Sequence, residues 1–119
     1  MKQELRTLIS AAVTASVDWG SRIQGAKYPG VVLQSVSKNG SHTFDGPDGT
    51  FVSRVQVDVY AEKYREAETI SQEILNQIDG YRGGKIMMIF FRAERDGREA
   101  GDTKRPFRIS QDFEIHWRL

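Results

Sequence analysis

The sequence predicts one α+β domain over residues 1–119, with a mostly antiparallel sheet and two helices packed on it. Two amphipathic helical patterns and four strand patterns indicate this class, in the order α-β-β-α-β-β. The clearest pattern is the C-terminal stretch 107–119, where apolar residues occupy one parity and mostly polar residues the other. Because strand side chains point alternately to opposite faces, this stretch predicts a long strand with one buried face. A chain of 119 residues has the size of a single domain.

Two segments have the three- and four-residue apolar spacing of amphipathic helices. The first helix is predicted over residues 2–16, on the pattern Leu5, Leu8, Ile9, Ala12 and Val13. The second is predicted over Tyr64–Ile78, and Gly80 is placed to end it. Its expected buried stripe consists of Ala67, Ile70, Ser71, Ile74, Leu75 and Ile78.

Four segments are expected to be strands, at residues 31–37, 51–61, 85–91 and 107–119. The first two form a predicted β-hairpin with a long polar tip, because turn-forming residues are dense between them. The third is a continuous apolar run, which favours a strand covered on both faces. Residues 18–30 and 92–106 are expected to be loops, since glycine, proline and charged residues gather there.

Composition narrows the classes of function. The formal net charge is +1 and the charges are mixed in sign, so the basic face of a duplex-DNA-binding domain is not indicated. The chain has no cysteine, which excludes disulfides, thiolate nucleophiles and cysteine-ligated metals. No apolar run is long enough to span a bilayer, and charges interrupt the N-terminal residues where a secretory signal would be apolar. We therefore expect a soluble protein that is made inside the cell.

One row of metal-binding residue types lies on the polar parity of the last predicted strand. Asp112, Glu114 and His116 are spaced to share a face, and with Asp58 they offer the donors of a small metal-dependent hydrolase or nuclease. Arginines fall in the same row, and nearby cations oppose metal binding. The row is better explained as the solvent face of an amphipathic strand, so we expect no catalytic residues, no metal and no cofactor.

Other motifs give weaker indications of chemistry. His42 lies near acidic residues, but no Ser or Cys nucleophile has a motif around it. The glycine-rich segment 80–84 follows a helix, whereas phosphate-binding loops follow a strand and open a helix. Residues 45–49 lack the regular oxygen ligands of a calcium loop. The charged segment 92–105 has two open interpretations, a solvated loop or an interaction arm.

Several segments together resemble one known family. They are His-Thr-Phe-Asp-Gly at 42–46, Val-Gln-Val-Asp-Val-Tyr-Ala at 55–61, Glu-Ala-Glu-Thr-Ile at 66–70, Ile-Asp-Gly-Tyr-Arg-Gly at 78–83 and Arg-Ile-Ser-Gln-Asp-Phe-Glu-Ile-His-Trp-Arg at 108–118. This pattern is similar to that of the tail-completion proteins of long-tailed bacteriophages, also called tail terminators or tail-to-head joining proteins. The similarity covers nearly the whole chain, least well at residues 14–30. The family often has Pro-Tyr before its first strand, whereas this chain has Tyr28-Pro29-Gly30.

The resemblance implies a structural virion protein without catalytic residues. Such a protein forms a homo-oligomeric ring, usually hexameric, at the head-proximal end of the tail tube, ends tube growth and joins the tail to the head connector. The implied partners are the tail tube protein and the connector protein, with DNA only passing through the lumen and no membrane. The implied location is the virion, after synthesis in the cytoplasm of the bacterial host. The assembly contacts implied by the family are His42, Phe44, Asp45, Pro47, Asp48, Arg95, Arg98, Lys104 and Arg105.

Mixed charge suits the meeting of neighbouring subunits in a ring, and near-neutral charge suits a lumen through which DNA slides. Two other classes stay open, the metal-dependent enzyme described above and a monomeric binding module. Residues 41–50 and 92–105 are expected to be mobile in the free protein and to become ordered on assembly, because they bury little apolar surface.

Overall fold

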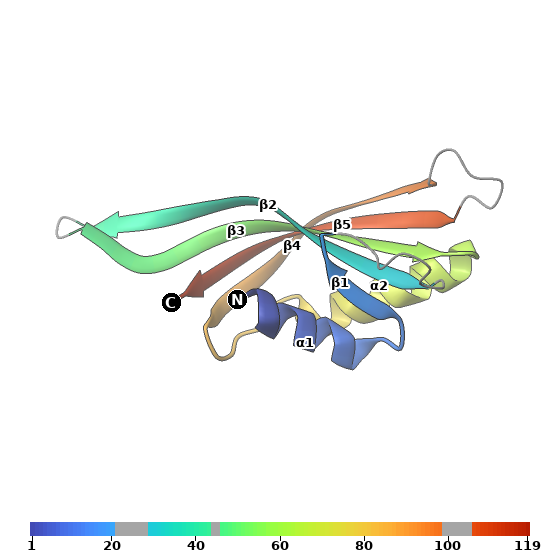
Figure 1. Ribbon diagram of the computed structural model, residues 1–119, viewed down its shortest axis with the longest axis horizontal. Coiled ribbons are helices and arrows are strands. Elements are labelled where there is room, and N and C mark those ends of the chain that lie inside the picture. Colours follow the sequence, from blue (N-terminus) through green and yellow to red (C-terminus); the bar gives the residue numbers. More distant parts are fainter. Residues whose placement is uncertain (21–28, 44–45, 99–105) are drawn as a thin grey trace.

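The computed structural model describes residues 1–20, 29–43, 46–98 and 106–119. These residues form one five-stranded sheet and two helices (Figure 1). In chain order the elements are α1 (Lys2–Ala12), β1 (Ser16–Trp19), β2 (Gly30–Thr43), β3 (Gly46–Ala61), α2 (Tyr64–Ile78), β4 (Ile86–Arg98) and β5 (Phe107–Arg118). The predicted α+β class is confirmed, and β1 is a short strand in addition to the four that were expected.

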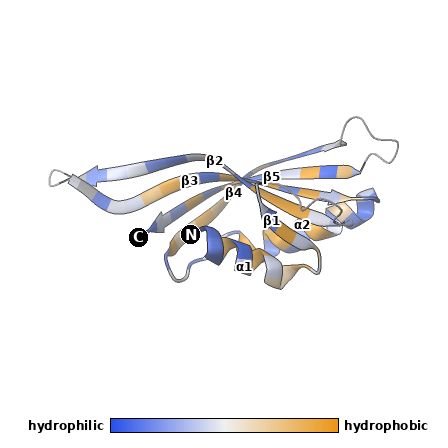
Figure 2. Cartoon of the chain, viewed as in Figure 1, coloured by the Kyte–Doolittle hydropathy of each residue, from blue (hydrophilic) through white to orange (hydrophobic). Residues whose placement is uncertain are grey.

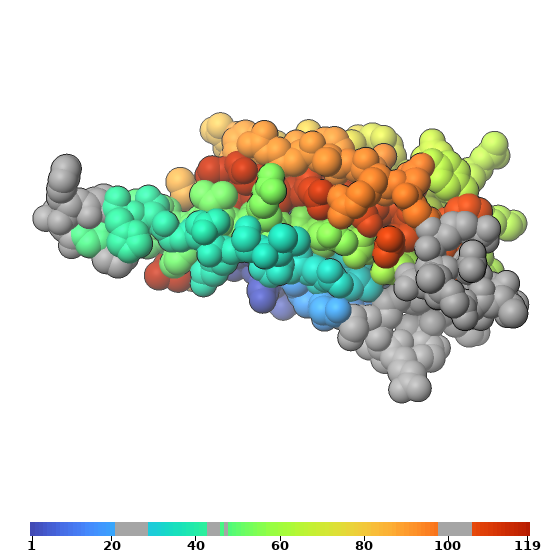
Figure 3. Space-filling view, turned by 90° about the horizontal axis from the view of Figure 1, so that it is seen from above, coloured from blue at the N-terminus to red at the C-terminus, as the bar shows by residue number. Residues whose placement is uncertain are grey.

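The strands are arranged in the order β1-β2-β3-β5-β4. Only the β1–β2 pair is parallel, and the other three pairs are antiparallel. Both helices lie on the same side of the sheet in Figure 1, and Figure 3 shows β2, β3, β5 and β4 side by side on the opposite, open face. The molecule is elongated, 56 × 26 × 24 Å, because β2 and β3 extend beyond the helices as an arm.

The core lies between the helices and the sheet. The apolar parity of β3 and β5 is buried as predicted, and Val57, Phe113 and Ile115 are among its most buried members. The predicted stripe of α2 is also confirmed, with Leu75 partly buried and the other five residues buried. Figure 2 shows apolar residues concentrated where the helices cover the sheet, whereas the far part of β2 is largely hydrophilic.

The first helix is shorter than predicted. It ends at Ala12, because Val13 is already extended, with φ −131° and ψ 155°. Residues 16–19 were expected to belong to the helix end and a loop, but they form β1, which pairs with Gly30–Leu33 of β2. The β-branched Thr14 and Val17 favour this extended path over a further helical turn.

The hairpin and the fourth strand are longer than predicted. The predicted polar tip is mostly strand, since β2 runs to Thr43 and β3 begins at Gly46. The register between β2 and β3 shifts at two places, between Ser35 and Ser37 and between Gly40 and His42. These irregularities accommodate the turn-forming residues within the ladder. Strand β4 continues to Arg98, through half of the segment that was expected to be a loop. Residues 41–43, 46–50 and 92–98 are therefore strand, and 44–45 and 99–105 lie outside the described residues.

Two expectations about burial are wrong. Strand β4 is covered on one face only, because Met87 and Phe90 are 46% and 37% exposed. The terminal Leu119, expected on the buried parity, is 71% exposed, although its backbone N–H donates to the carbonyl of Gly49 at 3.0 Å. Neither of the two helices in the described ranges is long and apolar enough to cross a membrane.

Candidate assembly surfaces

Three of the candidate assembly residues, His42, Pro47 and Asp48, lie on the described part of the arm. His42 lies on β2 and is exposed, and it is paired in register with Pro47 of β3. Asp48 is exposed on β3, where it accepts hydrogen bonds from the backbone N–H of Thr50 at 2.9 Å and from its hydroxyl at 2.6 Å. These bonds from Thr50 lower the pKa of the Asp48 carboxyl. The other two candidates, Phe44 and Asp45, lie outside the described residues.

An aromatic cluster fixes the base of the arm to the end of β5. Phe51 of β3 stacks on Trp117 with ring centroids 4.6 Å apart, and the Lys38 ammonium lies 4.5 and 5.1 Å from the two rings. The Trp117 indole N–H donates to the hydroxyl of buried Ser53 at 2.9 Å. A hollow of about 410 Å³ beside this cluster is lined by Met1, Lys2, Gln3, Ser35, Lys38, Ser53 and Trp117. The parity pattern predicted a buried Trp117, but it gave no indication of its bond to Ser53.

The open face of the sheet carries a ladder of paired charges. Arg95 of β4 donates to Asp112 of β5 at 2.7 Å and to the Gln56 side chain at 3.0 Å. One row along, Arg92 lies 3.0 Å and the His116 ring nitrogen 2.9 Å from the same oxygen of Glu114. The bonds from His116 and then from Arg92 lower the pKa of Glu114.

This ladder includes the carboxylates on which the alternative of a metal-dependent enzyme depends. Asp112 and Glu114 each accept from an arginine, and Asp58 is buried one strand away with bonds from Gln56 and Ser110. Within the described ranges no group of three His, Asp or Glu side chains is arranged to hold a metal ion. The carboxylates are thus held by neighbouring donors and face cations, an arrangement that opposes metal binding.

Of the four basic candidate residues, two lie on β4 and two are not described by the structure. Arg95 belongs to the ladder, and Arg98 is the last residue of β4. Lys104 and Arg105 fall outside the described residues. The structure therefore brings Arg95 and Arg98 onto one strand, at the end of the sheet opposite the tip of the arm.

Gln111 is the only polar residue on the apolar parity of the last predicted strand, so the sequence already marks it as unusual. Gln111 is fully buried, and its amide N–H₂ donates to the Ser71 carbonyl at 2.9 Å and to Glu94 at 3.0 Å. Its amide oxygen has no hydrogen-bond partner among the described residues. Gln111 thereby ties β5 to α2 and to β4, which is a structural role.

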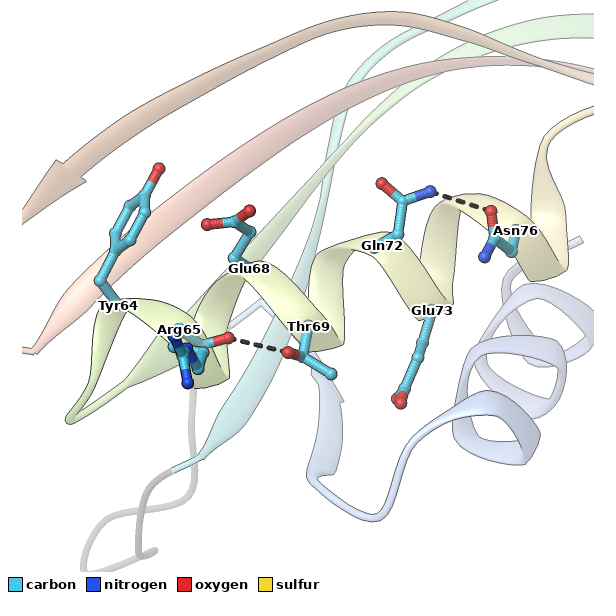
Figure 4. Close-up of a pocket in the computed structure, with 7 residues that line it drawn as sticks. All are labelled: Tyr64, Arg65, Glu68, Thr69, Gln72, Glu73 and Asn76. Atoms are coloured by element: carbon cyan, nitrogen blue, oxygen red, sulfur yellow. Dashed lines mark hydrogen bonds between the residues drawn. The ribbon is translucent and has the colours of Figure 1, made fainter.

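One hollow follows the outer face of α2, and Figure 4 shows its side chains along a single helix. It has a volume of about 650 Å³ and is lined by Tyr64, Arg65, Glu68, Thr69, Gln72, Glu73 and Asn76. The Tyr64 hydroxyl donates to Asp96 at 2.7 Å, which raises the pKa of Tyr64. The lining contains no nucleophile with a positioned base, so this surface does not have the arrangement of a catalytic site.

Comparison with known proteins finds likeness at the level of structure. No protein-family model matches the chain, and no curated protein matches it. Among solved structures, the fold is shared with a chain of a structure described as "Virion of native gene transfer agent (GTA) particle". The TM-score is 0.73, the match covers 99% of this chain and 91% of that chain, and the sequence identity is 15%. At that identity the likeness establishes a common fold.

Proposed function

We propose that this protein is a structural component of a phage-like virion. In this proposal it forms a ring at the head-proximal end of the tail tube, ends tube growth and joins the tail to the head connector. The observation that carries the proposal is the fold shared along nearly the whole chain with a chain of a gene transfer agent virion. The tail-terminator pattern of residues 42–46, 55–61 and 108–118 supports the finer assignment.

The geometry of the described residues supports assembly more than chemistry. A projecting arm, an uncovered sheet face and exposed apolar residues on β4 are surfaces on which other subunits can dock. The arginines of the ladder are neutralised by carboxylates. A lumen lined by such pairs would not hold DNA, because unpaired Lys and Arg contacts to phosphates drive affinity.

The location of the protein in purified particles tests the proposal. We would add an epitope after Leu119, which is exposed, and label particles from the producing strain with gold-conjugated antibody. We expect one labelled position per particle, at the junction of head and tail, and no label on particles from an untagged strain. Label along the whole tube, label on the head, or absence of the protein from purified particles would contradict the proposal.

Charge reversal tests Arg98 and the two basic candidates that follow β4 in the sequence, Lys104 and Arg105. Arg98, Lys104 and Arg105 would be changed to Glu together, and Arg95 would be kept because it pairs with Asp112. We expect folded protein that does not restore joined particles to a deletion strain. The matched control reverses Lys63, Arg65 and Arg82, which are exposed elsewhere, and should restore joining. Full rescue by the first variant would show that these basic residues take no part in joining.

A further inference from the structure

Two stretches of backbone at opposite edges of the sheet have no strand beside them in the described part of the chain. On one side β1 covers only Gly30–Leu33 of β2, so residues 34–43 form a free edge. Residues 34–36 and 38–42 are exposed, and Ser37 is partly buried. Lys38 is the only Lys, Arg, Asp or Glu among them. A long exposed strand edge with little charge is a template for pairing with another strand.

The direction of the free β2 groups follows from the ladder. The Leu33 carbonyl accepts from the backbone N–H of Gly20 on the outer side of β2. Residues 33–35 pair with β3 without a shift in register. The backbone N–H and carbonyl of Ser35 therefore point the same way as those of Leu33, away from β3. The Ser35 N–H and carbonyl therefore face outwards from the sheet.

The opposite edge, on β4, is only half covered. Ile89 exchanges backbone bonds with Gly80 and Tyr81, and the Phe91 N–H donates to the Asp79 side chain. These contacts seal the first half of the strand, and none of them reaches residues 92–98. Four charged side chains of this second half are engaged within the subunit: Arg92 bonds to Glu114, Glu94 to Gln111, Arg95 to Asp112 and Asp96 to Tyr64. These four side chains therefore do not prevent another strand from pairing with this edge.

We propose that residues 92–98 of β4 pair with residues 34–43 of β2 in a second copy of the chain, antiparallel and head to tail. This inference rests on the ring proposed above and names the contact that builds it. Strand direction alternates along β2-β3-β5-β4, so a neighbouring β2 beside β4 continues the alternation. Repetition of this contact uses both free edges and closes when the copies form a ring.

The pairing also fixes how neighbours are displaced. The register places Gln34 of β2 level with Ala93 of β4, through Gln56 and Asp112. From that level the free part of β2 runs towards the arm and the free part of β4 runs the other way. Neighbours are therefore shifted along the strands, as in closed sheets whose strands tilt relative to the ring axis. Pairing of two β2 edges would instead build a two-fold dimer and leave both β4 edges uncovered.

Site-specific cross-linking tests the contact, because the chain has no cysteine of its own. Antiparallel pairing of the two segments places Ala93 opposite residues 39–42, so Ser41→Cys on β2 and Ala93→Cys on β4 would be purified separately and treated with a short bismaleimide at high protein concentration. We expect covalent dimers when the two variants are mixed, and few when either is treated alone. Thr69→Cys, exposed on α2, is the control and should not link to either variant. Dimers of Ser41→Cys alone would indicate β2–β2 pairing, and the absence of dimers in the mixture would overturn the proposal.

A second variant removes an outward N–H without breaking the internal ladder. Proline is tolerated on an edge strand where its missing N–H faces solvent, so Ser35→Pro should unfold in urea close to the parent. We expect its apparent mass at high concentration to fall to that of a monomer, whereas Ser35→Thr, which keeps the N–H, should assemble. Rings of Ser35→Pro with the parental mass would overturn the proposed contact. Rings that cross-link as expected but are dispensable for joining particles would instead overturn the proposed function alone.

Discussion

The bond between Trp117 and Ser53 offers the sharpest test of how the base of the arm is held. Trp117→Leu removes a ring that stacks on Phe51 at 4.6 Å and leaves the hydroxyl of buried Ser53 without its donor. The aromatic pair contributes about 1 kcal/mol, and an unpaired buried hydroxyl costs about 1–3 kcal/mol. With the lost packing, we expect the free energy of unfolding to fall by roughly 3 kcal/mol.

The two partners should also be coupled. Ser53→Ala alone leaves the indole N–H unpaired and should cost about 1 kcal/mol. In the Trp117→Leu background the same change removes an orphaned hydroxyl, so the double variant should be about 1 kcal/mol more stable than the sum of the two single losses.

Urea unfolding followed by far-ultraviolet circular dichroism measures this coupling, because the signal comes mainly from the backbone and can be followed after Trp117 has been replaced. Lys38→Gln is a useful control, since it removes only the cation over the rings and should cost about 0.5 kcal/mol. The reasoning would be refuted if the losses in free energy of unfolding for Trp117→Leu and Ser53→Ala were strictly additive and the double variant lost less than about 1 kcal/mol in total.

Three further predictions follow from single side chains. Trp117→Asp should prevent folding, because an unpaired carboxylate would be buried. His116→Asp on the opposite face should lower the free energy of unfolding by only about 1 kcal/mol, through repulsion from Glu114. Circular dichroism and urea unfolding would distinguish the two variants. The pKa of Glu114 is lowered in the folded protein. The stability that its ionised carboxylate contributes to the fold is therefore fully present above the ordinary pKa of 4.5, and it is lost as the pH falls through the lowered pKa of the folded state. Glu114→Gln should accordingly be less stable than the parent near neutral pH, and urea unfolding in strong acid should show no difference. Gln111→Leu should cost about 1–2 kcal/mol, because the hydrogen bonds to the Ser71 carbonyl and to Glu94 are lost and the removal of a buried amide oxygen without a partner offsets only part of that loss. A melting temperature equal to or above that of the parent would contradict this.

Local patterns in the sequence were sufficient for the central strands and the second helix. Alternation at Val55, Val57 and Val59 and the stripe of α2 report burial directly, because one covered face selects apolar residues at the period of the element. The charged continuation of β4 was missed for the opposite reason. Arg95 belongs to a strand because Asp112 and Gln56 lie beside it, and such partners are remote in the sequence.

The remaining differences also arise from contacts that local propensity does not contain. Four residues pairing in parallel with β2 make β1, and so short a segment has little pattern of its own. Asn39 and Gly40 suggest a turn, yet they lie in the β2–β3 ladder, where Gly40 lies close to the Phe51 ring. Of the predicted assembly residues, Arg95 was found in an internal ion pair, and this role was not expected from the sequence.

Electron micrographs of particles from a strain that lacks this gene test the proposed function most directly. If the protein ends and joins tails, the strain should produce filled heads and separate tails, with tubes that are unjoined or of uncontrolled length. Supplying the parental gene from a plasmid should restore joined particles. Joined particles with tails of normal length in the deletion strain would contradict a role at the end of the tail.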